Sequence, residues 1–424
     1  MLKWYKLDNA AKLFPSVSSK KNSSVYRLSA VLSEAVDGAV LQKATNMVLP
    51  RFPIFTVKLR RGLFWNYLEK NDAAFFVKKE EIYPCFTMMP RRNSGYLFKV
   101  MYFKNRISLE VFHALTDGSG AMEFLKSLLY YYEKLLGNQI EDEGMIRLKD
   151  ETISESEIED SFSRYYLESN SKRAEFEKAY KIKGKQFEIY GNNVVSGVIK
   201  VDEILAIAKA QGVTITSYII ALLIYSIGKS QKNSGKIKYP IVVAVPVNLR
   251  KPFPSETLRN FFGVVNIGVK TSEYKTFEEL LSLVHKRLKT LTTKDNLQNF
   301  ISGNVKLEQN TAARLVPLFI KHKFVSLGFN FYGEKRKTLT LTNMGNVTLP
   351  KKLGEKIESM GVTLYPTKRS PINCGMCSVN GKLVVTFART LKESDIMECF
   401  FSFLAKEKDL DIEVYGNDWG HSNG

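Results

Sequence analysis

Residues 95–137 constrain the fold of this chain more than any other stretch, because they specify a hairpin and a long helix in immediate succession. "GYLFKVMYF" (95–103) and "ISLEVFHA" (107–114) are rich in β-branched and aromatic residues, and the "KNR" between them predicts a turn. Apolar residues then recur at helical spacing until Gly137, where the helix is expected to end. The stretch indicates a mixed α/β protein rather than an all-helical or all-strand one.

His113 closes the second of these strands and is one of only four histidines in the chain. Because side chains alternate along a strand, it shares a face with three apolar residues, Ile107, Leu109 and Val111. That face is expected to point into the protein. A neutral imidazole, with a reference pKa of about 6.5, suits general-base chemistry near neutral pH. The structural alternative is a core histidine held by a local turn, with Asp117 capping the helix.

A length of 424 residues is too great for one ordinary hydrophobic core, so two domains of about 200 residues are expected. Residues 138–162 carry nine acidic and two basic residues and little that could form a core, which predicts a surface crossover. We therefore expect an amino-terminal half at 1–160, a crossover linker at 161–190 and a carboxy-terminal half at 191–424.

The composition is that of a soluble globular protein, with 44% hydrophobic and 25% charged residues. The longest apolar run, "YIIALLIYSIG" (218–228), is much too short to span a bilayer. The amino terminus lacks the features of a secretory signal, and four cysteines do not make a disulfide framework. A cytoplasmic location is expected.

The net charge of +19 arises from short basic clusters such as "KLRR" (58–61) and "EKRK" (334–337) rather than from one tract. No zinc finger, ribonucleoprotein signature or basic helix accompanies them, so we expect no nucleic-acid partner. Solvated protein surface and a phosphate-bearing ligand both remain open as explanations.

Other candidate sites are weak. Cys374 and Cys377 have a Cys-x-x-Cys spacing, but the surrounding sequence predicts a strand, an Asn-Gly turn and another strand. The two thiols would then point to opposite faces, so no metal site is expected. His285 and His322 lie in Lys/Arg-rich stretches and are expected at the surface. No Gly-x-Ser-x-Gly, Walker or Rossmann pattern is present.

"HALTDG" (113–118) resembles the His-x-x-x-Asp-Gly motif of the CoA-dependent acyltransferase superfamily. This superfamily includes chloramphenicol acetyltransferase, the plant BAHD enzymes, alcohol acetyltransferases, wax ester synthases and peptide-synthetase condensation domains. The resemblance runs from about residue 5 to about residue 405, and the bacterial alcohol-acetyltransferase-like proteins are the most similar branch. Five further segments contribute to it, at 26–55, 212–227, 242–250, 261–269 and 340–350. Condensation domains usually have two adjacent histidines, and Phe112 stands in place of the first.

The resemblance implies two chloramphenicol-acetyltransferase-like domains with mixed sheets and a tunnel between them. It implies transfer of an acyl group from acyl-CoA, with acetyl-CoA as the first choice, to a small alcohol or amine. Acyl-CoA would be a co-substrate, no cofactor would be bound, and an acyl carrier protein is an alternative donor. We expect a monomer. The alternative function is a non-catalytic or carrier-protein-binding condensation-like module.

The same resemblance assigns expected roles to individual residues. His113 would be the general base, and Gly118 and Ser119 would border the tunnel. Thr342 and Asn343 would lie beside the developing oxyanion or the acceptor. Asp117 is expected to turn away from substrate and to pair with Arg250, because a buried carboxylate needs a partner and a guanidinium can bind it in two places.

Overall fold

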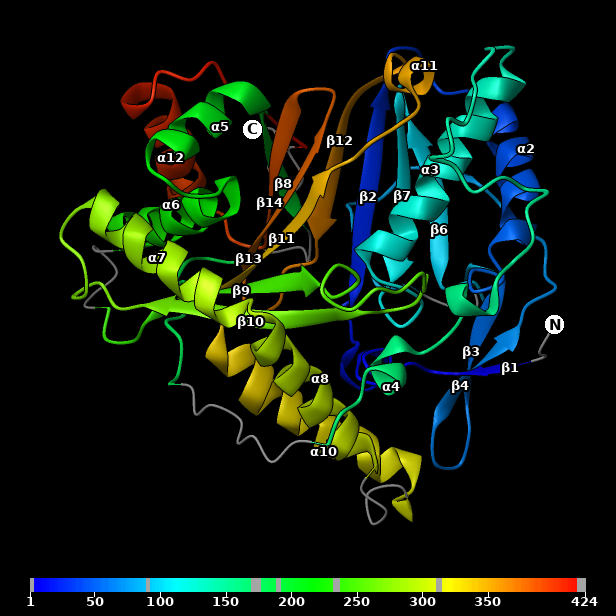
Figure 1. The fold of residues 1–424 in the computed structure, drawn as a ribbon, viewed down its shortest axis with the longest axis horizontal. Helices are drawn as coiled ribbons and strands as arrows, with labels where there is room; N and C mark the ends of the chain where they lie inside the picture. Colours follow the sequence, from blue (N-terminus) through cyan, green and yellow to red (C-terminus); the bar gives the residue numbers. More distant parts are fainter. Residues whose placement is uncertain are drawn as a thin grey trace.

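The structure is a computed structural model that describes residues 4–88, 92–168, 177–187, 192–231, 237–309 and 315–417. Two halves, each built from sheet and helix, lie side by side (Figure 1). The first half is drawn mostly in blue and cyan and the second in green to red. Parallel and antiparallel strand pairs coexist in both. The mixed α/β class expected from the sequence is confirmed.

The first half is built on a five-stranded sheet, with a three-stranded sheet beside it. The larger sheet has the strand order β12 (Ile357–Leu364), β2 (Val25–Leu32), β7 (Arg106–Phe112), β6 (Phe98–Phe103) and β5 (Lys78–Lys79). The smaller one has the order β1 (Trp4–Lys6), β4 (Asn66–Lys70) and β3 (Val57–Arg61). The helical elements of this half are α1 (Phe14–Val17), α2 (Gly38–Val48), the 3₁₀ turns Leu49–Arg51 and Glu155–Glu157, and α3 (Gly118–Leu135).

The hairpin and helix expected at 95–137 are present. β6 and β7 pair antiparallel, with Phe103 opposite Arg106 at the turn. Ile107, Leu109 and Val111 are fully buried, as the alternation of β7 predicted. α3 follows at once and packs against α2, β2 and β7. It is closed by Gly137, whose φ of 95° is the left-handed conformation that favours glycine.

The second half is built on a seven-stranded sheet. Its order is β10 (Phe262–Val269), β9 (Ile241–Asn248), β11 (Leu339–Asn346), β13 (Ile372–Val379), β14 (Lys382–Arg389), β8 (Asn193–Lys200) and β15 (Glu413–Gly416). Its longer helices are α5 (Val201–Ala210), α6 (Ile215–Ser230), α7 (Phe277–Leu291), α8 (Lys294–Gln309), α10 (Leu318–Gly328) and α12 (Asp395–Ser402). Short helical pieces are α4 (Ser161–Arg164), α11 (Lys351–Gly354), Phe329–Gly333, Glu334–Arg336 and Phe403–Glu407.

Strand β13 separates two hydrophobic cores. All eight of its residues are buried. Cys377 belongs to the core of the first half, whereas Cys374 belongs to the core of the second. The turn to β14 is Asn380-Gly381, with φ of 50° and 73°, as an Asn-Gly hairpin requires. The prediction that the two thiols point to opposite faces is confirmed, and both are free cysteines.

The two halves are also joined through the chain itself. β12 follows β11 in sequence, yet it pairs antiparallel with β2 and so extends the sheet of the first half. The expected carboxy-terminal half, 191–424, therefore contributes a strand to the other half. The crossover at 138–162 is not purely superficial, because Ile140, Ile146 and Phe162 are buried. Within the expected linker at 161–190, Tyr180 and Ile182 join the second core, and residues 169–176 and 188–190 lie outside the described residues.

Among the described residues, no single helix is both long enough and apolar enough to cross a membrane. Only α5 and α6 taken together pass that test, and they meet at an angle of 84°.

Candidate active site

His113 lies where the two halves meet. Its backbone N–H donates to the carbonyl of Ser24 at 2.9 Å, which continues the β2–β7 pairing one residue beyond β7. The imidazole stacks on Phe14 with ring centroids 4.3 Å apart, and the edge of Tyr26 lies at 5.0 Å. Phe262, the first residue of β10, approaches from the second half at 5.2 Å. Three aromatic rings from both halves therefore fix the plane of the histidine.

Asn260 fixes the orientation of the imidazole within this aromatic enclosure. Its Oδ1 lies 3.0 Å from His113 Nδ1. Its Nδ2 donates to Asp8 Oδ2 at 3.2 Å. Because a carboxylate oxygen only accepts hydrogen bonds, this contact identifies the amide nitrogen of Asn260 and leaves its oxygen facing His113. Nδ1 of His113 is then the protonated nitrogen, and Nε2 keeps its lone pair. The ring is held in the tautomer that leaves Nε2 free to accept a proton.

Burial also tunes the basicity of His113. Desolvation lowers the pKa of the imidazole below its ordinary value, and the charge of Asp117 and the hydrogen bond that His113 donates to Asn260 partly oppose this. A lowered pKa keeps the ring neutral at neutral pH. A neutral imidazole is the form that a general base requires.

Asp117 caps α3 and pairs with Arg250. Its Oδ1 accepts from the backbone N–H groups of Ser119 and Gly120, each at 3.1 Å. Arg250 Nη1 donates to Oδ2 at 2.9 Å, and Nη2 donates to Oδ1 at 3.2 Å. The two-pronged pair expected from the sequence is therefore present. It is not a surface contact, because the side chains are 6% and 14% exposed.

The Asp117–Arg250 pair also positions the segment that carries Asn260. Asp117 Oδ2 accepts from the backbone N–H of Phe261 at 2.8 Å. The Arg250 guanidinium donates to the carbonyls of Thr257 and Arg259, at 2.9 and 2.6 Å. The backbone on both sides of Asn260 is thus held in place. Asn260 in turn holds the ring of His113. The pair acts on the histidine indirectly, by fixing its hydrogen-bond partner.

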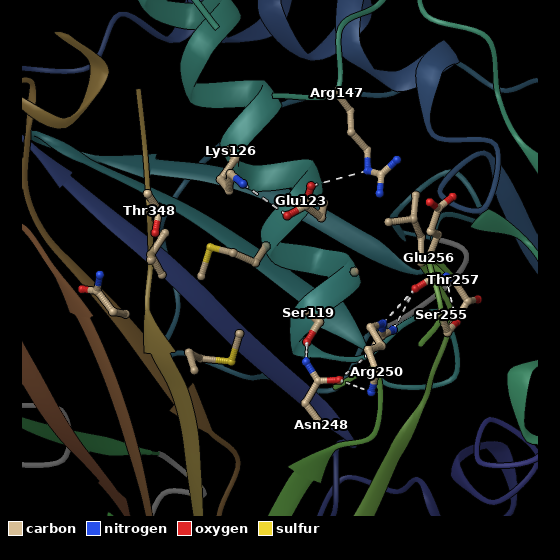
Figure 2. A pocket seen from close by; sticks show the side chains of 16 residues that line it. Ser119, Glu123, Lys126, Arg147, Asn248, Arg250, Ser255, Glu256, Thr257 and Thr348 are labelled. Atoms are coloured by element: carbon tan, nitrogen blue, oxygen red, sulfur yellow. Dashed lines mark hydrogen bonds and ion pairs between the residues drawn. The ribbon is translucent and has the colours of Figure 1, made fainter. Parts of the chain in front are cut away.

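A cavity of about 410 Å³ lies beside this junction. It is bounded by the start of α3, the segment after β9 and the end of β11, and Figure 2 shows Ser119, Asn248 and Arg250 on one of its walls. Asn248 Nδ2 donates to Ser119 Oγ at 3.1 Å across the two halves. Further along α3, Lys126 and Arg147 form ion pairs with Glu123, at 3.3 and 3.4 Å. His113 is not one of the residues that line this cavity.

Gly118, the first residue of α3, faces Met344 of β11. A Cβ at this position would come within 2.8 Å of the Met344 sulfur. Its φ is not in the left-handed range, so close approach, and not an unusual backbone angle, is the reason for glycine here. The N-cap of α3 is Asp117, as the structural alternative for this segment expected.

Thr342 and Asn343 lie on β11, in register with Gly375 and Met376 of β13. Asn343 Nδ2 donates to Thr216 Oγ1 at 2.9 Å, which ties β11 to the first turn of α6. Asn343 Oδ1 accepts from the backbone N–H of Gly345 at 2.7 Å. The side chain of Asn343 is exposed and that of Thr342 is half-buried. Their expected role beside an oxyanion or acceptor stays a prediction.

Sequence reasoning missed Asn260, Asp8 and Phe14. Asn260 is 147 residues from His113, and Asp8 is 252 residues from Asn260, so no local spacing connects them. The one feature of the sequence that could have pointed to Asn260 is its position shortly after the turn that carries Arg250. His285 and His322, expected at the surface, are both partly exposed. Their rings contact Ser217 Oγ at 3.1 Å and Asn66 Nδ2 at 3.2 Å.

No family model and no curated protein matches this sequence. Solved structures do match over nearly the whole chain. TRI101 from F. sporotrichioides, complexed with coenzyme A and T-2, has a TM-score of 0.63 at 11% identity, over 96% of this chain and 98% of that one. Polyketide synthase associated protein 5 from Mycobacterium tuberculosis has a TM-score of 0.60 at 13% identity, over 95% and 97% of the two chains.

The wax ester synthase/diacylglycerol acyltransferase of Marinobacter aquaeolei VT8 has a TM-score of 0.56 at 14% identity, over 95% of this chain and 98% of that one. The chain has the two-domain chloramphenicol-acetyltransferase-like fold. This confirms the fold expected from the resemblance. Condensation and epimerization domains of peptide synthetases share it, at TM-scores of 0.56 and 0.58.

Proposed function

We propose that this protein transfers an acyl group from acyl-CoA to a hydroxyl or amine acceptor, with His113 as the general base. The observation that carries the proposal is the geometry of the His113 ring. Nδ1 is engaged by Asn260, burial lowers the pKa of the ring, and Nε2 is the nitrogen left to take a proton. The fold shared with TRI101, complexed with coenzyme A, and with the wax ester synthase supports the same chemistry.

In this mechanism Nε2 of His113 removes the proton from the acceptor O–H or N–H as that atom attacks the thioester carbonyl. The carbonyl oxygen becomes an oxyanion, for which Thr342 and Asn343 are the proposed neighbours. The tetrahedral intermediate then collapses, the carbon–sulfur bond breaks, and the imidazolium returns its proton to the departing thiolate. The products are the ester or amide and free CoA.

Exclusion of water matters for this reaction, because hydrolysis of the thioester competes with transfer. The stacked ring of Phe14 and the rings of Tyr26 and Phe262 surround His113 with apolar surface. We propose that donor and acceptor reach His113 through a tunnel between the halves, with the cavity beside Ser119 and Asn248 as one mouth. Acetyl-CoA is the first donor to test, with the protein acting in the cytoplasm as an alcohol-acetyltransferase-like enzyme.

The second candidate is a condensation-like module that binds a carrier protein with or without catalysis. Structural likeness to condensation and epimerization domains favours it. Condensation domains usually have two adjacent histidines, and Phe112 stands in place of the first of them, which argues against a condensation domain proper.

Release of free thiol from acyl-CoA distinguishes the two candidates. The protein is incubated with acetyl-CoA and with longer acyl-CoAs, each against a panel of alcohols and amines. We expect thiol release that depends on both an acceptor and His113. If no acyl-CoA supports acceptor-dependent release, while a thioester on a carrier protein does or binding alone is seen, the proposed function is wrong and the second candidate stands.

A further inference from the structure

An apolar surface lies exposed around α10, the helix drawn in yellow-orange at the lower edge of Figure 1. Phe319, Phe324 and Leu327 on this helix are 70%, 69% and 60% exposed. Phe331, just beyond the helix, is 60% exposed. Isolated exposed apolar residues are normal on proteins, but a contiguous group on one element marks an interaction site.

α10 has one covered side and one exposed side that carries large apolar residues. At about 100° per residue, Phe319, Phe324 and Leu327 fall within an arc of about 140°, and Lys323 lies within the same arc. Leu318 and Lys321, on the opposite side, are buried, and the helix packs against α1. The exposed side is therefore an amphipathic face, in which aromatic and aliphatic side chains surround a lysine.

The hairpin between β3 and β4 extends this surface. Leu63 and Trp65 at its tip are 73% and 37% exposed. The backbone N–H of Leu318 donates to the Leu63 carbonyl at 2.9 Å. Lys321 Nζ donates to the Phe64 carbonyl at 3.1 Å and lies 3.5 Å from the centre of the Trp65 ring. The hairpin tip is thus bonded to the side of α10 that carries Leu318 and Lys321. We name the exposed apolar residues of the hairpin tip and the helix the α10 surface: Leu63, Trp65, Phe319, Phe324, Leu327 and Phe331.

Positive charge flanks the helical part of the α10 surface, whereas Glu69, Asp72 and Glu308 line the pocket that Trp65 borders. Arg61 and Lys323 are exposed beside it, and Lys335 Nζ lies 3.4 Å from the centre of the Phe331 ring. No aspartate or glutamate occurs in residues 60–66 or 315–333. Exposed Phe, Leu and Trp side chains fringed by lysine and arginine are the features of a helix that lies in the interface of a bilayer with anionic lipids. A second copy of this chain would bring an equally cationic surface opposite it.

We propose that the α10 surface docks the protein on the surface of an anionic phospholipid bilayer. Its Phe and Leu side chains enter the acyl-headgroup boundary, and Arg61 and Lys323 contact the phosphates. The covered side of α10 is linked to the candidate active site through α1, because α1 contacts α10 and its Phe14 stacks on His113.

Vesicle co-sedimentation tests this proposal in the absence of any substrate. The wild-type chain is expected to bind vesicles of phosphatidylcholine mixed with phosphatidylglycerol far better than phosphatidylcholine alone. F319S/F324S should weaken this binding at least about 10-fold, because two aromatic side chains no longer enter the membrane. R61E/K323E should weaken binding to the anionic vesicles by about 10-fold or more.

Two controls separate docking from misfolding and from catalysis. Phe76 is 61% exposed beside β5, and F76S should bind vesicles as the wild type does. H113A should also bind normally, so failure of the proposed reaction leaves this test intact. Tryptophan fluorescence provides a second measurement that does not depend on the serine variants. The emission of the wild type should shift to shorter wavelength when anionic vesicles are added, and W65F should lose most of that shift.

Unchanged vesicle binding by F319S/F324S would overturn the proposal. A second outcome would also overturn it: the wild-type chain does not bind anionic vesicles, sediments as a dimer, and becomes a monomer in F319S/F324S. The α10 surface would then be a subunit interface. Retention by an acidic carrier protein, lost in R61E/K323E without any vesicle binding, would assign the surface to that protein and equally refute membrane docking.

Discussion

The carboxylate of Asp117 and the guanidinium of Arg250, 133 residues apart in the chain, are joined by two hydrogen bonds across the junction of the two halves. The same carboxylate caps α3 and holds the backbone of Phe261. One ion pair therefore fixes the turn after His113 and the segment that carries its partner Asn260. Its loss is expected to disturb stability and activity together.

Removal of either partner leaves a largely buried charge uncompensated. Asp117→Ala and Arg250→Ala should each lower the free energy of unfolding by about 3–5 kcal/mol. The double variant should lose less free energy of unfolding than the two single variants together, because the second substitution removes a charge that has already lost its partner. Chemical denaturation of all four proteins measures this cycle, and additive losses would refute the coupling.

A solvent-exposed ion pair provides the control for that cycle. Arg60 Nε and Glu69 Oε2 are 2.8 Å apart on neighbouring strands, and both side chains are well exposed. Arg60→Ala should leave the denaturation midpoint near that of the wild type, because exposed pairs contribute little.

His113→Ala should lower turnover in the thiol-release assay by at least about 100-fold, because the general base is lost. The melting temperature should change little. His285→Ala is the matched control, since His285 is also half-buried and hydrogen-bonded, to Ser217 Oγ, but lies on α7. Near-wild-type turnover by a folded His113→Ala protein would remove His113 from the mechanism.

The pH profile should report on Asn260. In the wild type, the acid limb of kcat/KM is expected below the ordinary histidine pKa of about 6.5, because burial lowers the pKa of His113. The hydrogen bond that His113 donates to Asn260 opposes that shift, so Asn260→Ala should move the acid limb to still lower pH. The plateau rate should fall roughly 10- to 100-fold as the ring loses its orientation. An acid limb that stays in place would show that Asn260 does not act through His113.

The lowered pKa of His113 also has a consequence for stability. Below the unfolded-state value of about 6.5, the unfolded chain binds a proton that the buried ring resists. The stability linked to the neutral ring is thus present above that pH and is lost as the pH falls through the folded-state pKa. His113→Ala should abolish this part of the acid sensitivity, which urea titrations across the range can measure.

Gly118→Val should abolish activity without a large loss of stability. The new side chain would press on the end of the Met344 side chain, which can move, rather than on the backbone. A bulkier residue would fill the space between α3 and β11 beside the proposed tunnel. Gly118→Val combined with Met344→Ala should recover part of the turnover. Full activity in Gly118→Val alone would mean that the substrate path runs elsewhere.

Asn343→Ala should lower kcat more than it raises KM, if the amide contacts the transition state. The observed bond to Thr216 Oγ1 offers a structural alternative. Thr216→Val removes that bond while keeping Asn343, and it should leave kcat near the wild-type value. A rise in KM with kcat unchanged in Asn343→Ala would assign the residue to substrate binding only.

The sequence by itself determined the local parts of this protein. Alternation placed the apolar face of β7 in the core, helical spacing defined α3, and Asn380-Gly381 specified the turn between β13 and β14. These features depend on neighbours within a few residues, so periodicity reveals them. Asp117 and Arg250 were predictable because a buried carboxylate requires a cation and a resembling family supplied the place to look.

Only the tertiary structure decided which distant residues meet. Asn260 reaches His113, Asp8 reaches Asn260, and β12 leaves its neighbours in sequence to pair with β2. It also decided that the exposed side of α10 remains uncovered while the other side packs on α1. Contacts of this kind depend on how whole sheets and helices pack, and no spacing within the chain encodes their distances.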